Sequence, residues 1–148
     1  MIRPLLTYIN SCRSTKYTLL AYLILIFVVS GLNIKTSSHG FIYKDKVIHL
    51  IEYFILGVLF IRYFILSKKM YIKRTVIFTV LAGSLYAVSD EIHQGFVGYF
   101  SSGIFGGVRD PDILDVVADI TGIIVSVAVY IFVNKLKFKL NGKLNEGF

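Results

Sequence analysis

Carboxylates, histidines and a tyrosine gather at the edges of the apolar runs in this chain, in spacings that could support chemistry. Asp45 and His49 are four residues apart, and Glu52 and Tyr53 follow one turn further on. On a helix this spacing brings all four to roughly one stripe. Carboxylates beside an imidazole can transfer protons, ligate a divalent cation or hydrogen-bond a polar ligand. Asp45 could also act only as a helix N-cap.

A second acidic group closes the third apolar run. Asp90 shares a helical face with His93 and Gln94, and Glu91 is turned about 100° away from that face. We expect the helix to end near Gln94. Carboxylates at a helix C-terminus oppose the macrodipole, so they call for a basic partner or a bound cation. His93 on its own is more typical of an interfacial residue than of a ligand.

A third pair of carboxylates, Asp115 and Asp119, is spaced four residues apart, with Gly122 at the next turn. Asp112 or Pro111 can start this helix, and an acid near a helix start is electrostatically favourable. Asp119 lies about 10 Å along the axis from that start, at about 1.5 Å per residue. Helix capping therefore does not explain Asp119.

The stretch 95–111 is rich in glycine, serine and phenylalanine, and Arg109 is its only cation. We expect a long loop here, at a membrane interface. Arg109 could be a structural counter-ion for the nearby acids, or it could hold a phosphate or carboxylate of a ligand. The sequence leaves both interpretations open.

The composition predicts elements that cross a membrane. Of 148 residues, 55% are hydrophobic and 17% are charged, compared with roughly 25% charged in soluble domains. Four stretches approach the length of about 20 residues that a spanning helix needs: Tyr17–Ile34, Lys46–Leu66, Arg74–Gln94 and Asp112–Asn134. The prediction is an all-α, polytopic membrane protein with four transmembrane helices in a compact antiparallel bundle. Small residues at 83 and 87 and at 122 and 126 should let the third and fourth helices approach closely.

The charges predict an orientation. Sixteen Lys and Arg against nine Asp and Glu give a net charge of +7. Most cations precede the first span, lie between the second and third, or follow the fourth, so the positive-inside rule places both termini in the cytoplasm. Because the basic residues lie between apolar runs, the sequence excludes a nucleic-acid-binding domain. Eight of the nine acids fall on the opposite, extracytoplasmic side.

We divide the chain into a cytoplasmic segment 1–16, a four-helix domain 17–134 and a basic cytoplasmic tail 135–148. The first apolar run could alternatively be a secretory signal peptide. Its length, and the poor cleavage site at Val28, Val29 and Ser30, favour a retained helix. Cys12, the single cysteine, cannot form an intramolecular disulfide.

These motifs resemble the VanZ-like family of small bacterial membrane proteins over the part 45–134. The first family block is filled by Asp45, Lys46, His49, Tyr53, Leu56 and Gly57. The second is filled by Asp90, Glu91, Gln94 and Phe96, and the third by Arg109, Asp115 and Gly122. Asp119 stands where the family usually has Asn, and the stretch from Gln94 to Arg109 is longer than usual. The resemblance implies a role in the cell envelope and low-level resistance to the glycopeptide teicoplanin.

Three functions fit these residues. The first is an envelope factor in the plasma membrane that binds a lipid or a lipid-linked envelope precursor at the outer leaflet. The second is an intramembrane hydrolase or transferase that depends on a metal or on carboxylates. The third is a buried polar network without a ligand, in a structural or partner-binding protein. Whether the chain is an enzyme stays open, because it lacks the G-x-S-x-G, H-E-x-x-H and P-S-G-H signatures. A homo-oligomer is also open.

The predicted site is the set of polar residues that these helices bring to one end. The candidate binding residues are Asp45, His49, Glu52, Tyr53, Asp90, Glu91, Gln94, Arg109, Asp115 and Asp119. The candidate proton-transfer pair is His49 and Glu91. The candidate ligands for a divalent cation are His49, Asp90, Glu91, Asp115 and Asp119.

Overall fold

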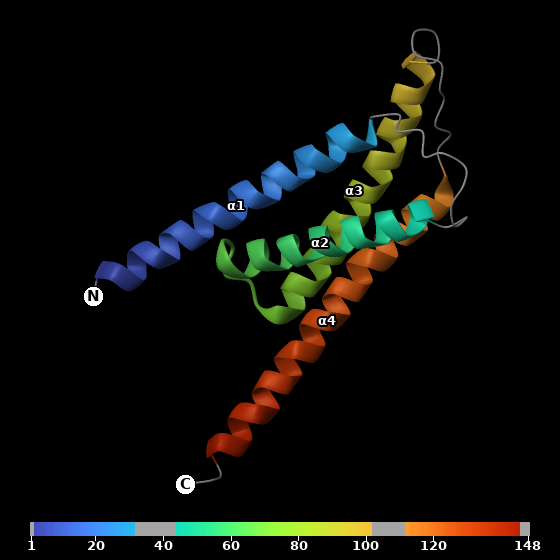
Figure 1. The fold of residues 1–148 in the computed structure, drawn as a ribbon. Helices are drawn as coiled ribbons and strands as arrows, with labels where there is room; N and C mark the ends of the chain where they lie inside the picture. The colour runs from blue at the N-terminus through green and yellow to red at the C-terminus, as the bar shows by residue number, and fades with distance from the viewer. Residues whose placement is uncertain (1, 32–43, 102–111, 146–148) are drawn as a thin grey trace.

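The computed structural model describes residues 2–31, 44–101 and 112–145, and every regular element in these ranges is a helix. The helices are α1 (Ile2–Ser30), α2 (Lys44–Leu66), α3 (Ile72–Ser101) and α4 (Ile113–Asn145), drawn in Figure 1. Each contains a segment long and apolar enough to cross a membrane: Cys12–Ser30, Asp45–Leu66, Ile72–Phe96 and Ile113–Leu136. The chain is thus an all-α, multi-pass membrane protein, and the predicted four-helix fold is confirmed.

Helix α2 is the centre of the bundle. It packs against α1, α3 and α4, and its contact with α4 is the most extensive. Successive helices run in opposite directions, and α1 and α4 diverge from the end where α2 begins (Figure 1). Over the described residues α1 does not pack against α4. Helices α2 and α3 each contact all three of the other helices, so they connect α1 to α4.

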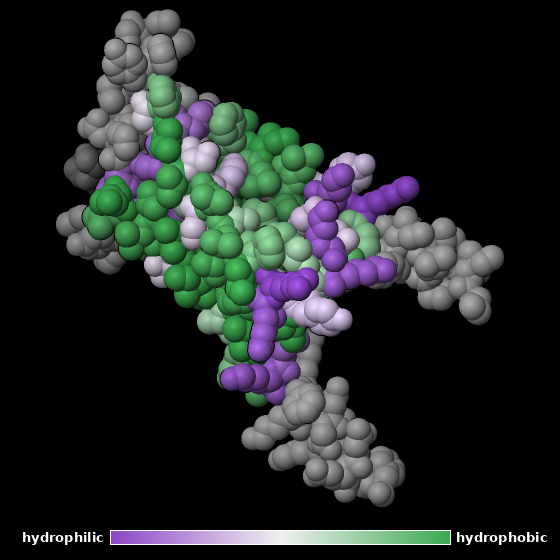
Figure 2. All heavy atoms as spheres, turned by 180° about the vertical axis from the view of Figure 1, so that it is seen from behind, coloured by the Kyte–Doolittle hydropathy of each residue, from purple (hydrophilic) through white to green (hydrophobic). Residues whose placement is uncertain are grey.

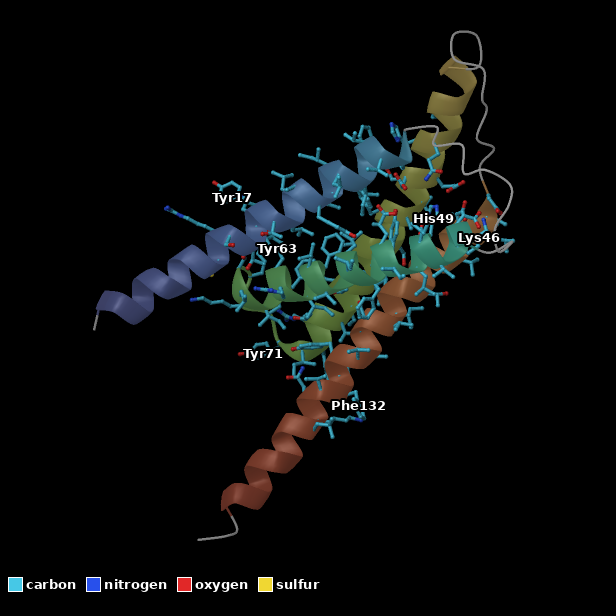
Figure 3. All side chains as sticks on the ribbon, viewed as in Figure 1. Tyr17, Lys46, His49, Tyr63, Tyr71 and Phe132 are labelled. Atoms are coloured by element: carbon cyan, nitrogen blue, oxygen red, sulfur yellow. The ribbon has the colours of Figure 1, made fainter. Side chains whose placement is uncertain are left out.

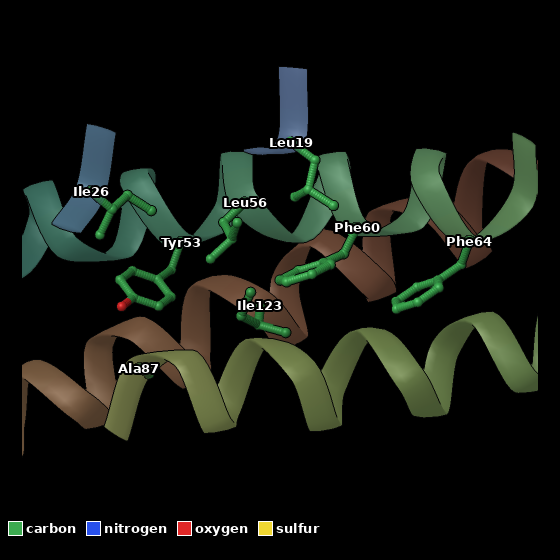
Figure 4. Packing of buried hydrophobic residues seen from close by; sticks show 8 residues of the cluster. All are labelled: Leu19, Ile26, Tyr53, Leu56, Phe60, Phe64, Ala87 and Ile123. Carbon is green, nitrogen blue, oxygen red and sulfur yellow. The ribbon is translucent and has the colours of Figure 1, made fainter. Parts of the chain in front are cut away.

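The apolar core lies between α2 and the helices around it. Tyr53, Leu56 and Phe60 of α2 point toward Ala87 of α3 and Ile123 of α4, and all five are buried (Figure 4). Most other large apolar side chains are exposed on the outside of the bundle. Figure 2 shows that hydrophobic side chains cover the middle of the molecule and hydrophilic ones gather at its two ends. This distribution is expected where the outside of the bundle meets lipid chains.

The closest approach of two helices is between α4 and α2. A Cβ atom on Gly122 would collide with the Leu50 carbonyl oxygen and lie 2.9 Å from the Phe54 backbone nitrogen. A Cβ atom on Gly57 would likewise collide with the Ser126 side chain. The prediction that the small residues at 122 and 126 face the third helix is therefore wrong. They face α2, because the helix backbones come closest along that pair.

On α3, Gly83 does face α4. The Ile123 side chain fills the space that a larger residue would occupy, with its Cδ1 atom 2.6 Å from the position of a Cβ. This half of the predicted α3–α4 contact is confirmed. In the α3–α4 contact a side chain of α4 packs against the backbone of α3. In the α2–α4 contact two helix backbones pack against each other.

All four helices are longer than the predicted spans: α2 begins only two residues earlier, and α4 continues to Asn145, past the expected end at Asn134. Helix α1 begins at Ile2 instead of Tyr17, so the first cationic residues lie on the helix. Helix α3 continues to Ser101, past the expected end at Gln94. The extension adds two glycines, each of which weakens a helix by only about 1 kcal/mol relative to alanine, and no proline. The expected loop 95–111 is therefore helical over its first seven positions. Helix α1 ends at Ser30, and position 34 lies outside the described residues.

Candidate functional site

Polar side chains from α2, α3 and α4 meet at the end of the bundle where α2 and α4 begin (Figure 3). We call this set the polar cluster: Lys46, His49, Asp90, Glu91, Gln94, Asp112, Asp115 and Asp119. All of its members except Lys46 and Asp112 are buried. Helix spacing explains the convergence on α2 and α4, where residues three or four apart lie on one face.

Lys46 joins the start of α2 to the start of α4. Its Nζ atom forms ion pairs with the carboxylates of Asp112 and Asp115, and it lies 3.4 Å from Asp45 Oδ2. From the sequence, Lys46 is a boundary charge and part of a family motif, and it was not among the predicted site residues. The available signal was its spacing of three from His49, which puts both side chains on the face that meets α4.

His49 lies between two carboxylates of α4. Its Nδ1 atom is 3.0 Å from Asp119 Oδ1, and its Nε2 atom is 3.9 Å from Asp115 Oδ2. The first distance is a hydrogen bond. The second is too long for one, but it becomes an ion pair when the imidazole is protonated. The predicted stripe on α2 and the predicted pair on α4 therefore do meet.

Asp90 connects α3 to α1. Its Oδ2 atom accepts a hydrogen bond of 3.1 Å from Gln94 Nε2, and its Oδ1 atom accepts one of 2.6 Å from Ser30 Oγ. Ser30 is the last residue of α1, and it was not predicted as part of the site. Both donors are neutral, so within the described part of the chain this buried carboxylate is solvated by two dipoles and not by a cation.

Glu91 connects α3 to the start of α4, because its Oε1 atom accepts a hydrogen bond from the Asp112 backbone N–H. Asp112 in turn caps α4, with its Oδ1 atom 2.9 Å from the Leu114 backbone nitrogen. The hydrogen bond from Lys46 and the one from this N–H hold the pKa of the Asp112 carboxyl below its ordinary value. Since α3 continues to Ser101, the acids at 90 and 91 do not end a helix, and the predicted conflict with the macrodipole does not arise.

The remaining predicted residues lie at different depths. Tyr53 is fully buried, Glu52 is half-buried, and Asp45 stays exposed at the edge of the cluster. The ring of His93 stacks on Phe27 of α1 with centroids 3.8 Å apart, so it belongs to the α1–α3 contact. Arg109 lies outside the described residues.

The described residues do not form a ready-made set of ligands for a metal ion. Among the residues that the structure describes, no group of three or more His, Cys, Asp or Glu side chains is arranged to hold a metal ion. The carboxylates of Asp115 and Asp119 that face α2 are engaged by Lys46 and His49. We therefore derive no step through a metal.

Comparison with known proteins agrees with the motifs. The VanZ/LLP1 family model matches residues 8–134, a range that includes all eight members of the polar cluster. No curated protein and no solved structure gives a significant match to the chain.

Proposed function

This chain belongs to the VanZ/LLP1 family, and we propose from that premise that it is an envelope factor of the cell membrane. In this proposal its polar cluster lies at the outer leaflet and binds a lipid or a lipid-linked component of the envelope. The resemblance described above adds that this activity lowers susceptibility to teicoplanin.

One observation carries the proposal: carboxylates lie buried within helices that are apolar enough to span a membrane. Asp90, Asp115 and Asp119 are each less than 5% exposed. Charged groups inside membrane-spanning helices are energetically costly, and by default they mark a functional site. Asp115 and Asp119 are balanced by Lys46 and His49, whereas the contacts of Asp90 are neutral. A cationic ligand bound at Asp90 accounts for the burial of this carboxylate.

Orientation supports the outer leaflet. The turn between α2 and α3 carries Lys68 and Lys69, and the first turn of α3 adds Lys73 and Arg74. It lies at the end of α2 opposite to the polar cluster. By the positive-inside rule this turn is cytoplasmic, and the cluster then faces outward. At that depth the nearest polar molecules are the headgroups of lipids and of lipid-linked precursors.

The proposal is tested in cells that express wild type, Asp90→Asn or Asn134→Leu, at equal membrane abundance. Teicoplanin carries a lipid tail, so a protein that binds outer-leaflet lipids can change its access. We expect wild type and Asn134→Leu to protect against teicoplanin more than against vancomycin, and Asp90→Asn to lose this protection. Protection that survives in Asp90→Asn would contradict a role for the cluster, and the absence of protection by wild type would contradict the resistance function.

A second candidate function is acid–base chemistry at His49, because Asp119 bonds its Nδ1 atom and so fixes the imidazole. Product analysis of a labelled lipid-linked precursor, incubated with purified wild type or His49→Gln, tests it. A product that only wild type forms supports this candidate, and an unchanged precursor contradicts it.

A further inference from the structure

We propose that Asp90, Gln94 and Tyr53 form a seat for the primary ammonium group of an amine-bearing lipid headgroup. The other half of the polar cluster, made of Lys46, His49, Asp115 and Asp119, then joins α2 to α4 and does not bind the ligand. This inference rests on the proposed function and narrows it to one half of the cluster and one ligand chemistry.

The α2–α4 half already has partners within itself. Lys46 is paired with Asp115 and with the capping residue Asp112, and His49 is hydrogen-bonded to Asp119. Removing one member of such a buried pair leaves a charge uncompensated, which is a structural effect. A ligand would have to displace these contacts in order to bind here.

The proposed seat, made of Asp90 and Gln94 of α3 and Tyr53 of α2, contains buried polar atoms with unused hydrogen-bonding capacity. The Gln94 amide donates to Asp90 through Nε2, so its Oε1 atom lies beside the same carboxylate. Within the part of the chain that the structure describes, neither Gln94 Oε1 nor the Tyr53 hydroxyl has a hydrogen-bond partner. Both residues are nearly inaccessible, with 2% and 0% of their surface exposed. Buried polar groups are normally satisfied, and unused ones indicate a missing partner.

The Tyr53 hydroxyl points toward the Asp90 side of the cluster. Its ring projects from α2 toward α3 and α4 in Figure 4. The ring centroid is 6.3 Å from that of Tyr86, which precedes Asp90 by one helical turn on α3. The three residues thus converge from two helices on one buried location.

The chemistry of these groups favours a primary ammonium. An ammonium supplies the positive charge that the Ser30 and Gln94 contacts of Asp90 lack. Its N–H groups can donate to Asp90, to Gln94 Oε1 and to the Tyr53 oxygen. A quaternary amine has the charge but no N–H donor. A phosphate would face the surrounding carboxylates, and the nearest described cation, Lys46, is already paired.

The experiment measures which lipid stays bound to the purified full-length protein in detergent. The probe is an equimolar mixture of phosphatidylethanolamine, phosphatidylcholine and phosphatidylglycerol, and retained lipid is counted by native mass spectrometry. We expect phosphatidylethanolamine to be retained at least about tenfold over the other two, the ratio that one charge-assisted hydrogen bond supplies. Asp90→Asn and Gln94→Leu should each remove this preference. The matched control Asn134→Leu, which alters an amide at the other end of the bundle, should keep it.

The possible negative results distinguish failure of the ammonium seat from failure of the proposed function. Equal or stronger retention of phosphatidylglycerol or phosphatidylcholine overturns the ammonium seat and leaves lipid binding standing. A phosphatidylethanolamine preference that persists in Asp90→Asn shows that the seat is elsewhere. Retention of no lipid overturns the proposed function as well. Should Asp90→Asn not fold, Tyr53→Phe keeps the ring and removes only the hydroxyl, and we expect about a threefold lower preference; an unchanged preference overturns the role of Tyr53.

Discussion

Single residues of the polar cluster differ in how their charge is balanced. Lys46 and His49 face the carboxylates of α4, whereas Asp90 on α3 accepts hydrogen bonds from Gln94 and Ser30. Substitutions on the two sides should therefore have different effects. Changes on the α4 side should lower stability, and changes at Asp90 should mainly affect binding.

Asp119 allows a direct test of the α4 side. An Asn at this position, the residue usual in the family by resemblance, can still accept a hydrogen bond from His49 Nδ1. We expect Asp119→Asn to change the free energy of unfolding in detergent by less than about 1 kcal/mol. Asp119→Leu removes the acceptor and should cost about 1–3 kcal/mol, as for other buried polar groups that lose a partner. An equal loss in both variants would show that the charge of Asp119, and not the hydrogen bond, is what matters.

The contacts of the Asp112 carboxylate should make the stability of the fold depend on pH. The hydrogen bond with Lys46, and the cap on α4, lower the pKa of this carboxyl in the folded state. Such a group stabilises the fold above its unfolded-state pKa of about 3.9, and the contribution is lost as the pH falls through the folded-state pKa. We expect the melting temperature to fall below about pH 4 in wild type and to fall less steeply in Asp112→Asn. Identical slopes in the two proteins would contradict this linkage.

At the scale of helices, the pair α2 and α4 holds the site together. Gly122 lies against the backbone of α2, one turn beyond Asp119. This close approach brings His49 within hydrogen-bonding distance of Asp119. Helix α1 contributes more lightly: it covers α3 through the Phe27–His93 stack and through Ser30.

Two matched glycine substitutions test whether α2, and not α3, sets the position of α4. A methyl group at Gly122 meets backbone atoms of α2, which cannot move without shifting the helix. A methyl group at Gly83 meets only side-chain atoms of Ile123, which can shift without moving the backbone of α4. We expect Gly122→Ala to cost about 1–3 kcal/mol of unfolding free energy, a typical cost of overpacking, and Gly83→Ala to cost less. A larger loss in Gly83→Ala would show that α3, and not α2, sets the position of α4.

Over the whole molecule, an apolar middle separates two polar ends of different character. One end holds buried carboxylates, and the other holds the lysine-rich turn between α2 and α3. Figure 2 shows hydrophilic side chains at both ends. This asymmetry is the basis of the proposed orientation, with both termini in the cytoplasm.

Cysteine labelling tests the orientation. In a Cys12→Ser background, Ile113→Cys places a thiol at the exposed start of α4, and Lys68→Cys places one at the exposed turn after α2. We expect a membrane-impermeant maleimide to label Ile113→Cys in intact cells, and Lys68→Cys only after permeabilisation. The reverse pattern would place the polar cluster in the cytoplasm and would overturn its proposed role at the outer leaflet.

The features that depend on local spacing follow from the sequence alone. Four runs of about 20 apolar residues require four helices in lipid, whatever their neighbours. Helical spacing predicted the face of α2 on which His49 lies. It also predicted that Asp115 and Asp119 share one face of α4. The convergence of carboxylates at one end followed from the alternation of helix direction.

Which helix faces meet depends on how the four helices pair in three dimensions. That Gly122 packs on α2 depends on helix pairing, which the small-residue spacing does not specify. The role of Lys46 depends on the same pairing, because a lysine at a helix boundary becomes an ion-pair partner only when carboxylates of another helix are brought to it. Ser30 reaches Asp90 from 60 residues away. Such contacts join helices that are distant in the chain, so no local pattern records them.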